Sequence, residues 1–244
     1  MRRFASLFML SLLLLLLPLA GAAGDGPKRD AVLNSVAFLT AHPDLRWRRE
    51  GMLAYDRGKL ELAASYFRRA ARYADKPSQA MYAEMLWEGR GVAPDRPMAY
   101  AWMDLAAERA YPAFLGKRER YWAGLDAAGR ARALEVGQDV YAEYGDVVAK
   151  PRLETILERA SRNVTGSRVG FVGRVDVLVP GPDGSWERIR GTEYYDAQFW
   201  KPQQYWRWQD RTWKAPDAGR VEVHKPEQVE DAPPPADDAP PPAP

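Results

Sequence analysis

A spacing of 36 residues recurs in the first half of the sequence. Four residues that would share a helix return at this offset: Ala63, Tyr66, Ala70 and Ala71 are followed by Ala99, Trp102, Ala106 and Ala107. The alanines at 63, 70 and 71 stand at positions i, i+7 and i+8 of one helical face, where small side chains let two helices approach closely. A period of this length is typical of solenoids built from pairs of helices. The repeat therefore predicts helical hairpins stacked side by side.

Glycine and proline divide this repeat into helices and turns. Gly58 and Gly89 lie only 31 positions apart, which predicts that the turn after Gly89 is five residues longer than the turn after Gly58. Pro77 and Pro112 fit helix starts, because a missing amide donor costs nothing in the first turn. Each copy of the repeat is therefore expected to be one antiparallel hairpin.

The second copy carries a distinctive set of small, apolar and turn-forming residues. They are Ala80, Ala83, Leu86, Gly89, Gly91, Val92, Asp95, Ala99, Trp102, Ala106 and Ala107. This set resembles the Sel1-like repeat, a bacterial relative of the tetratricopeptide (TPR) repeat, and its most specific part is the Gly-x-Gly-Val loop followed by Asp95. Residues 45–74 resemble a degenerate, more TPR-like copy. The resemblance implies an α-solenoid that binds a protein or peptide as an adaptor and has no catalytic activity.

A helix is also predicted ahead of the repeats, over residues 30–41. Val32, Val36 and Leu39 would lie on one of its faces, and Pro43 would end it. This helix would cover the N-terminal end of the solenoid. At the other end, residues 127–144 have the pattern of the terminal capping helix that such arrays need.

The first 23 residues have the layout of a secretory signal peptide. Two arginines, an unbroken leucine run and a proline precede small residues at 20–23. Cleavage after Ala22 or Ala23 would leave no stable membrane insertion. The sequence contains no cysteine, which excludes a lipoprotein anchor. A periplasmic or secreted protein of a Gram-negative bacterium is therefore expected.

The composition favours binding over catalysis. The chain has 244 residues with no cysteine, two histidines and a formal net charge of +2, which leaves little for metal, thiol or acid–base chemistry. The near-neutral charge does not point to nucleic acid. Carboxylates at i, i+4 spacing (Glu84 with Glu88, Asp104 with Glu108) fit solvated helix faces. We expect no enzyme, no cofactor and no metal site.

Arginines are concentrated in the first copy of the repeat. Four of them are candidate ligand-binding residues: Arg46, Arg49, Arg68 and Arg72. Such a cluster would receive an acidic peptide or a cell-wall polymer. The alternative is a basic face that only keeps the protein in solution.

The pattern changes after residue 162. Alternating apolar and polar residues over 168–179 predict a strand, a turn at 180–184 follows, and residues 186–190 would pair back as a hairpin. A last short strand is predicted at 220–223. Residues 163–224 are therefore expected to form a small, aromatic-rich β module.

The aromatic side chains of this module have two interpretations. The candidates for ligand binding are Tyr194, Tyr195, Trp200, Trp206 and Trp208. Flat rings could stack on the sugars of peptidoglycan, and this would need at least two coplanar rings facing solvent. Alternatively the rings are structural, because so small a unit has little aliphatic core and would pack its aromatics against the end of the solenoid.

Residues 225–244 form a tail of proline, alanine and acidic residues. Five acidic side chains stand against one lysine, a net charge of −4, and the segment is too polar to bury a core. The tail is expected to be disordered and locally extended, as a spacer or as a ligand for another protein.

The expected fold class is mainly α, with the solenoid over residues 24–162. The leading functional hypothesis is an exported, non-catalytic adaptor that binds a protein or peptide through its helical repeats. The alternative is a cell-wall glycan-binding protein that uses the C-terminal aromatic module. Neither hypothesis involves nucleic acid.

Overall fold

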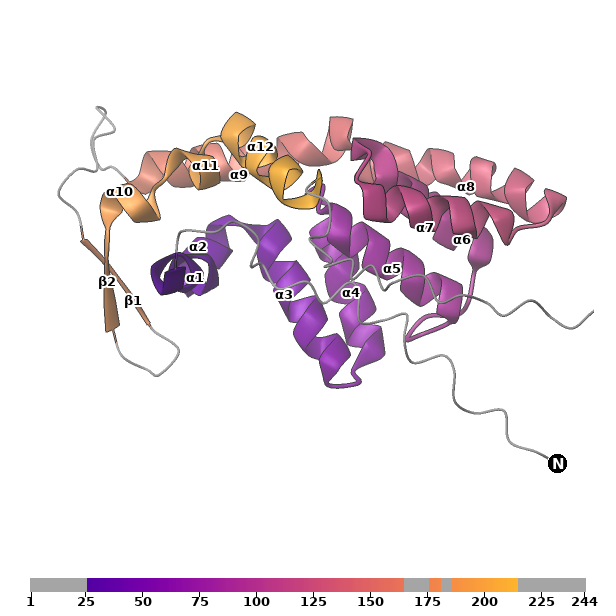
Figure 1. The fold of residues 1–244 in the computed structure, drawn as a ribbon, viewed down its shortest axis with the longest axis horizontal. Helices are drawn as coiled ribbons and strands as arrows, with labels where there is room; N and C mark the ends of the chain where they lie inside the picture. The colour runs from indigo at the N-terminus through magenta and orange to yellow at the C-terminus, as the bar shows by residue number, and fades with distance from the viewer. Residues whose placement is uncertain (1–25, 165–175, 181–185, 215–244) are drawn as a thin grey trace, which may run out of the picture.

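The structure is a computed structural model that describes residues 26–164, 176–180 and 186–214 (Figure 1). These residues are mostly helical, with one two-stranded antiparallel sheet, which confirms the expectation of a mainly α protein. The predicted signal peptide, the predicted strand at 220–223 and the acidic tail lie outside them. Among the described helices, none is long and apolar enough to cross a bilayer.

The first described segment consists of helices and the short turns and loops that connect them. They are α1 (Gly26–Asn34), α2 (Val36–Ala41), α3 (Pro43–Asp56), α4 (Leu60–Ala71), α5 (Lys76–Glu88), α6 (Arg96–Ala106), the 3₁₀ helix η1 (Ala107–Arg109), α7 (Pro112–Ala123), α8 (Ala127–Tyr144) and α9 (Asp146–Val164). The C-terminal part contains a hairpin and three helices. They are β1 (Asp176–Pro180), β2 (Trp186–Arg190), α10 (Gly191–Tyr194), α11 (Ala197–Trp200) and α12 (Pro202–Lys214).

The repeat forms two helical hairpins, α3 with α4 and α5 with α6, and α4 packs against α5. Their ends follow from local chemistry. The Asp75 and Asp95 side chains accept hydrogen bonds from the backbone amides three residues on, at 3.1 Å each, and so begin α5 and α6. Gly89 ends α5 in the left-handed conformation, at φ +69°.

The alanines of the repeat form the contact surface of these hairpins. All six that recur at the 36-residue offset are buried: Ala63, Ala70, Ala71, Ala99, Ala106 and Ala107. Of the two paired aromatics, Trp102 is also buried, whereas Tyr66 is half-buried and stacks on Trp47 with ring centroids 5.4 Å apart. Among the other residues of the second copy, Ala80, Ala83 and Leu86 are buried in α5, and Val92 is half-buried in the loop after it.

The N-terminal helix differs from the prediction. The expected single helix is broken at Ser35, whose hydroxyl accepts a hydrogen bond from the Phe38 amide at 3.3 Å and caps α2. This break turns Val36 out to 75% exposure, while Leu39 stays buried. Pro43 stands at the first position of α3, one residue after His42, so the expected stop is also the next helix start.

The predicted β module is only partly present. The described strands β1 and β2 pair as an antiparallel hairpin, with Val177 opposite Ile189, whereas residues 168–175 of the predicted strand and residues 181–184 of the predicted turn lie outside the described residues. The following residues, 191–214, are helical, and the expectation of a β-rich module is wrong for them. Tyr205, Trp208 and Gln209 are all buried, and their i, i+3, i+4 spacing gives α12 one buried face.

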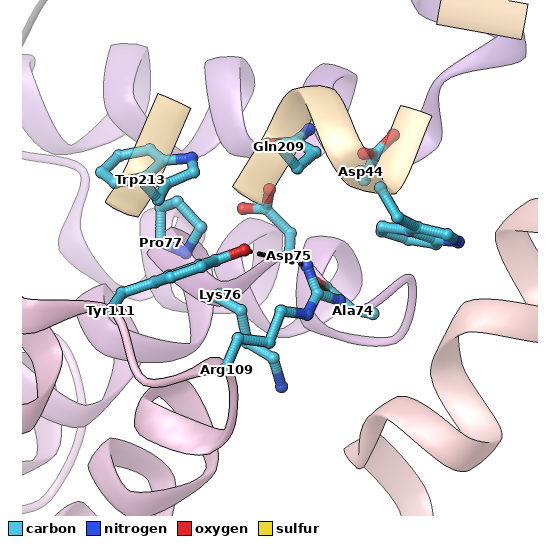
Figure 2. A pocket seen from close by; sticks show the side chains of 10 residues that line it. Asp44, Ala74, Asp75, Lys76, Pro77, Arg109, Tyr111, Gln209 and Trp213 are labelled. Carbon is cyan, nitrogen blue, oxygen red and sulfur yellow. Dashed lines mark hydrogen bonds between the residues drawn. The ribbon is translucent and has the colours of Figure 1, made fainter. Parts of the chain in front are cut away.

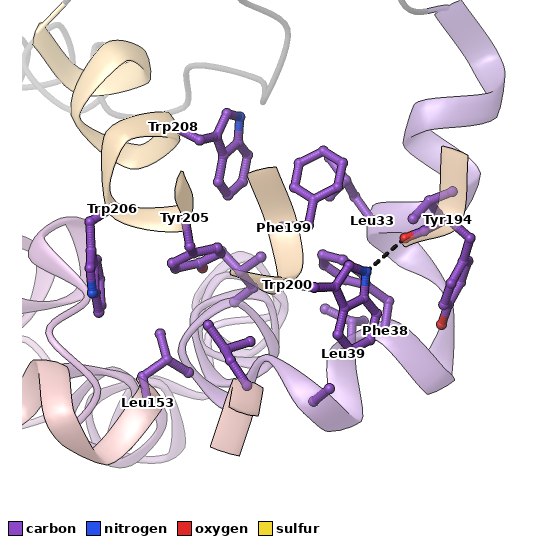
Figure 3. Close-up of a cluster of buried hydrophobic side chains, with 14 of the residues drawn as sticks. Leu33, Phe38, Leu39, Leu153, Tyr194, Phe199, Trp200, Tyr205, Trp206 and Trp208 are labelled. Atoms are coloured by element: carbon purple, nitrogen blue, oxygen red, sulfur yellow. Dashed lines mark hydrogen bonds between the residues drawn. The ribbon is translucent and has the colours of Figure 1, made fainter. Parts of the chain in front are cut away.

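The C-terminal helices α11 and α12 pack on the first and the last helices of the segment 26–164. α11 and α12 contact α9, and α2 also contacts α9. Figure 3 shows the resulting core, in which rings from α11 and α12 meet Phe38 of α2 and Leu153 of α9. The rings therefore pack mainly on the N-terminal helices and α9 rather than only on the end of the repeats. This arrangement joins residues 31–45 to residues 194–208 in one apolar cluster.

Candidate functional site

An open groove of about 390 Å³ lies along α4. Its walls come from α4, from α5, from the loop after α5 and from the C-terminal end of α8. The lining residues are Glu61, Ala64, Ser65, Arg68, Arg69, Arg72, Tyr82, Val92, Glu143 and Tyr144. Helical repeats thus bring a row of basic side chains beside two tyrosines.

The sequence of α4 explains why the arginines face this groove. Phe67, Ala70 and Ala71 bury the opposite side of the same helical turns. Arg68 and Arg72 are four residues apart, so they lie one above the other on the exposed face. The helix is strongly amphipathic, and its arginines point away from the core.

Each arginine of the groove is positioned by a neighbour. The Arg72 Nη1 atom lies 2.6 Å from Glu143 Oε1. Arg68 donates a 3.5 Å hydrogen bond to the Tyr144 hydroxyl, and this bond raises the pKa of Arg68 above its ordinary value. The Arg68 guanidinium also lies 5.7 Å from the centre of the Tyr82 ring. A guanidinium has five N–H donors, so these contacts leave donors for a ligand.

The third arginine is held by aromatic rings. Arg69 stands 4.9 Å from the Trp47 ring and 5.7 Å from the Tyr66 ring. Stacking of this kind fixes a guanidinium without using its in-plane donors. Three arginines against two glutamates, Glu61 and Glu143, leave the lining with an excess of positive charge. Carboxylates are the ligands that such a surface favours, because arginine binds them through two parallel hydrogen bonds.

The four arginine candidates separate into two pairs. Arg68 and Arg72 line the groove. Arg46 lies over the Trp47 ring at 4.9 Å, and Arg49 donates to the Asn34 carbonyl at 3.1 Å, so neither belongs to the lining. The sequence prediction also missed the contribution of α8. Nothing in the local pattern could show that Glu143 and Tyr144 return beside α4, more than 70 residues later in the chain.

The aromatic candidates of the C-terminal part lie in the core. Tyr194, Trp200, Trp206 and Trp208 are each no more than 9% exposed. Tyr195 is half-buried and meets Tyr194 edge to face, with ring centroids 4.7 Å apart. The five rings therefore do not offer the coplanar, solvent-facing pair that stacking on a sugar requires.

Polar atoms of these rings have partners inside the protein. The Trp200 indole donates to the Tyr194 carbonyl at 2.7 Å, and the Trp206 indole donates to Glu154 Oε1 at 2.7 Å. Buried Trp residues find such acceptors when they are structural. The packing explains how so many rings fit in a small segment, because α1, α2, α3 and α9 supply the surfaces that cover them.

A second cluster of charged residues lies between α3, α5, η1 and α12 (Figure 2). Arg109 holds Asp146 through bonds of 2.6 and 2.8 Å, and Tyr111 donates to Asp210 at 2.7 Å. Burial opposes the charge of Asp146, but Arg109 and the nearby Lys76 keep its pKa below the ordinary range. The side chains fill the space between them and leave no room for a ligand. We interpret this cluster as structural.

The carboxylates noted in the sequence take part in ion pairs. Glu84 is buried beside Lys117, which corrects the expectation of a solvated face at this position. Asp104 lies 3.5 Å from Arg118, and Glu108 lies 2.6 Å from Lys76. Each of these three carboxylates thus lies beside a cation, although Lys76 also pairs with Asp146 and Arg118 with Glu119. In the described part of the chain, no group of His, Asp and Glu side chains is arranged to hold a metal ion.

Comparisons with known proteins give no match: no family model, no curated protein and no solved structure is significantly similar to the chain.

Proposed function

We propose that this chain is an exported, non-catalytic adaptor, and that its helical repeats bind an acidic segment of a partner protein in the groove along α4. One observation carries the proposal: Arg68, Arg69 and Arg72 line an open groove together with Tyr82 and Tyr144. In this view α3 to α8 act as a short α-solenoid of Sel1-like pairs. The secretory signal predicted at the N-terminus would place the adaptor in the periplasm or outside the cell.

The volume of the groove limits the length of the peptide that it can bind. A volume of about 390 Å³ is enough for only a few residues of an extended peptide. Each solvent-exposed ion pair contributes about 0.2–1 kcal/mol, so two or three such pairs give modest affinity. We therefore expect a weak, salt-sensitive interaction with a short acidic segment, and little binding to a basic or neutral one.

The test is peptide binding by fluorescence anisotropy. The probe is a labelled peptide of alternating glutamate and serine, and its neutral analogue carries glutamine in place of glutamate. At a groove that holds no other ligand, the double variant Arg68→Gln/Arg72→Gln should bind the acidic probe about tenfold more weakly, which corresponds to about 1.4 kcal/mol. Arg57→Gln is the matched control, because Arg57 is exposed in the turn between α3 and α4 and lies outside the groove lining.

Equal binding of the acidic probe to the double variant and to the Arg57→Gln control would refute the proposal. Equal binding of the acidic probe and its glutamine analogue would refute it as well, since the groove would then not recognise carboxylates. Thermal unfolding followed by circular dichroism checks that all variants keep the helical fold.

A further inference from the structure

We propose that the acidic tail of this chain, residues 225–244, occupies the groove along α4 until a partner displaces it. This inference rests on the proposed function, since it assigns an occupant to the same groove. It adds a regulatory element that lies within the same polypeptide. Charge, side-chain chemistry and reach each support the assignment.

The charges of the two segments are complementary. The groove presents Arg68, Arg69 and Arg72 against two glutamates, one of which, Glu143, already pairs with Arg72. The tail carries five acidic residues and one lysine, a net charge of −4. Its acidic residues fall into two groups, at 227–231 and at 237–238. Either group would bring carboxylates to the guanidinium donors that face solvent.

The apolar part of the groove also suits the tail. Tyr82 and Tyr144 line the groove beside the arginines. Proline runs at 233–235 and 240–242 flank the second acidic group of the tail. Proline-rich segments bind in aromatic-lined grooves because the ligand loses little conformational entropy on binding. The combination of proline and acid in the tail therefore matches the combination of tyrosine and arginine in the groove.

The tail is long enough to reach the groove. The described chain ends at Lys214, and the neighbouring Trp213 lies beside Pro77, at the start of α5 (Figure 2). Tyr82 is five residues further along the same helix, which is about 7.5 Å at 1.5 Å per residue. Residue 227 follows Lys214 by 13 residues, a span of up to about 43 Å when extended. Crossing one helix, about 10 Å wide, uses a small part of this length.

Covalent linkage makes even a weak contact sufficient. A short covalent connection typically holds a segment at an effective concentration of about 1 mM. If the free tail peptide bound with a Kd of about 0.1 mM, the attached tail would fill roughly nine-tenths of the grooves. An external acidic ligand would then bind about tenfold more weakly than to an empty groove.

The experiment uses the full chain that follows the predicted signal cleavage and the same glutamate–serine probe as above. The tail is neutralised in place by Glu227→Gln, Glu230→Gln, Asp231→Asn, Asp237→Asn and Asp238→Asn. This variant should bind the probe about tenfold more tightly than the parent chain in low salt. The gain should disappear when Arg68→Gln and Arg72→Gln are added, and should persist when Arg57→Gln is added instead.

Each result separates this inference from the proposed function. Arginine-dependent binding of the probe that does not change on neutralising the tail overturns the tail inference and leaves the proposed function standing. Absence of arginine-dependent binding in both chains overturns both. A gain that persists in the Arg68→Gln/Arg72→Gln background also overturns the inference, because the tail would then act elsewhere.

Sedimentation velocity distinguishes the tail of the same chain from the tail of a second copy. Docking within one chain predicts a monomer whose sedimentation does not depend on protein concentration. Concentration-dependent dimers that vanish on neutralising the tail would overturn docking within the chain in favour of exchange between copies.

Discussion

Two buried titratable side chains stand close together where α2 meets α3. Both ring nitrogens of His42 lie 2.8 Å from backbone carbonyls, those of Phe38 and Phe199. Burial lowers the pKa of His42 to about 4, although both carbonyls favour the protonated ring. Two residues on, Asp44 accepts a hydrogen bond from the Tyr205 hydroxyl, and burial, with a contribution from Asp75, raises its pKa to about 7. These contacts join the N-terminal helices to the C-terminal ones. Burial at this junction disfavours the charged form of both side chains.

The raised pKa of Asp44 predicts a loss of stability as pH rises. In the unfolded chain Asp44 releases its proton near pH 3.9, whereas in the folded chain it keeps the proton up to about pH 7. Between these values the folded state binds more protons, so the contribution of Asp44 to stability falls from pH 4 to pH 7. Asp44→Asn does not titrate, so its free energy of unfolding relative to the parent chain should rise over this range, by an amount on the order of 3 kcal/mol.

Urea unfolding of both chains at pH 4 to 8 measures this difference. Asp56→Asn is a suitable control, because Asp56 is exposed at the end of α3. Parallel pH profiles for the parent and Asp44→Asn would show that Asp44 is ionised in the fold over the whole range.

At the level of single residues, the sequence identified two of the ten residues that line the groove, which are half of the four arginine candidates. Arg68 and Arg72 could be chosen because arginines are concentrated in the first copy of the repeat. Arg46 and Arg49 carry the same charge but are turned to Trp47 and to the Asn34 carbonyl by contacts that composition does not encode. Tyr82 could not be recognised either, because its role depends on the approach of Arg68 from another helix.

At the level of elements, the turns of the two hairpins differ in how much they depend on glycine. Gly58 and Gly91 both have positive φ, +70° and +67°. A Cβ atom at Gly58 would meet nothing within 4 Å, whereas at Gly91 it would come within 2.4 Å of the Leu60 carbonyl carbon. The longer turn therefore packs tightly on the first turn of α4, the helix that forms one wall of the groove.

Alanine substitutions at these two glycines should separate backbone strain from crowding. Gly58→Ala places a Cβ in the left-handed region and should cost about 1–2 kcal/mol of folding stability. Gly91→Ala carries the same strain and also forces the turn away from α4, so its cost should exceed that of Gly58→Ala by at least about 1 kcal/mol. Chemical denaturation of the two variants gives the comparison. Equal losses would mean that the turn moves away from Leu60 at no cost.

The elements that the sequence predicted correctly are those whose signal is local. Alanine spacing, Asp75, Asp95 and Gly89 define α4 to α6 from within a few residues of each helix. The segment 191–214 was misread, because its Tyr, Phe and Trp residues have high strand propensity and the hairpin before it favoured more strand. Its helices are stabilised by surfaces from α2, α3 and α9, which lie far away in the sequence.

For the whole molecule, the decisive contacts join the two ends of the described chain. Phe38 of α2 meets Phe199 and Trp200 edge to face, each with ring centroids 5.7 Å apart. Tyr205 of α12 reaches Asp44 across 161 positions of sequence. The repeats thus lie inside a larger fold that closes on itself, and α11 and α12 complete the apolar core that α2 shares with α9.

Removal of the C-terminal helices should therefore release the N-terminal ones. In a chain ending at Arg190, amide hydrogens of α2 should exchange with solvent at least a hundredfold faster than in the full chain, as expected when a buried cluster worth several kcal/mol is lost. Amides of α5 and α6 should keep most of their protection, because their own core remains. Hydrogen exchange followed by mass spectrometry reports both regions in one experiment, and unchanged exchange in α2 would contradict the interlocked fold.

The closure of the fold by its two ends also sets an order of events during synthesis. A polypeptide emerges from the ribosome N-terminus first, so residues 26–45 appear about 160 residues before their partners around Tyr205. Throughout that interval Phe38 lacks the rings of Phe199 and Trp200 that pack against it in the finished fold, and closing so long a loop is slow. The N-terminal helices therefore complete their packing only after α11 and α12, the last helices of the described chain, have been made.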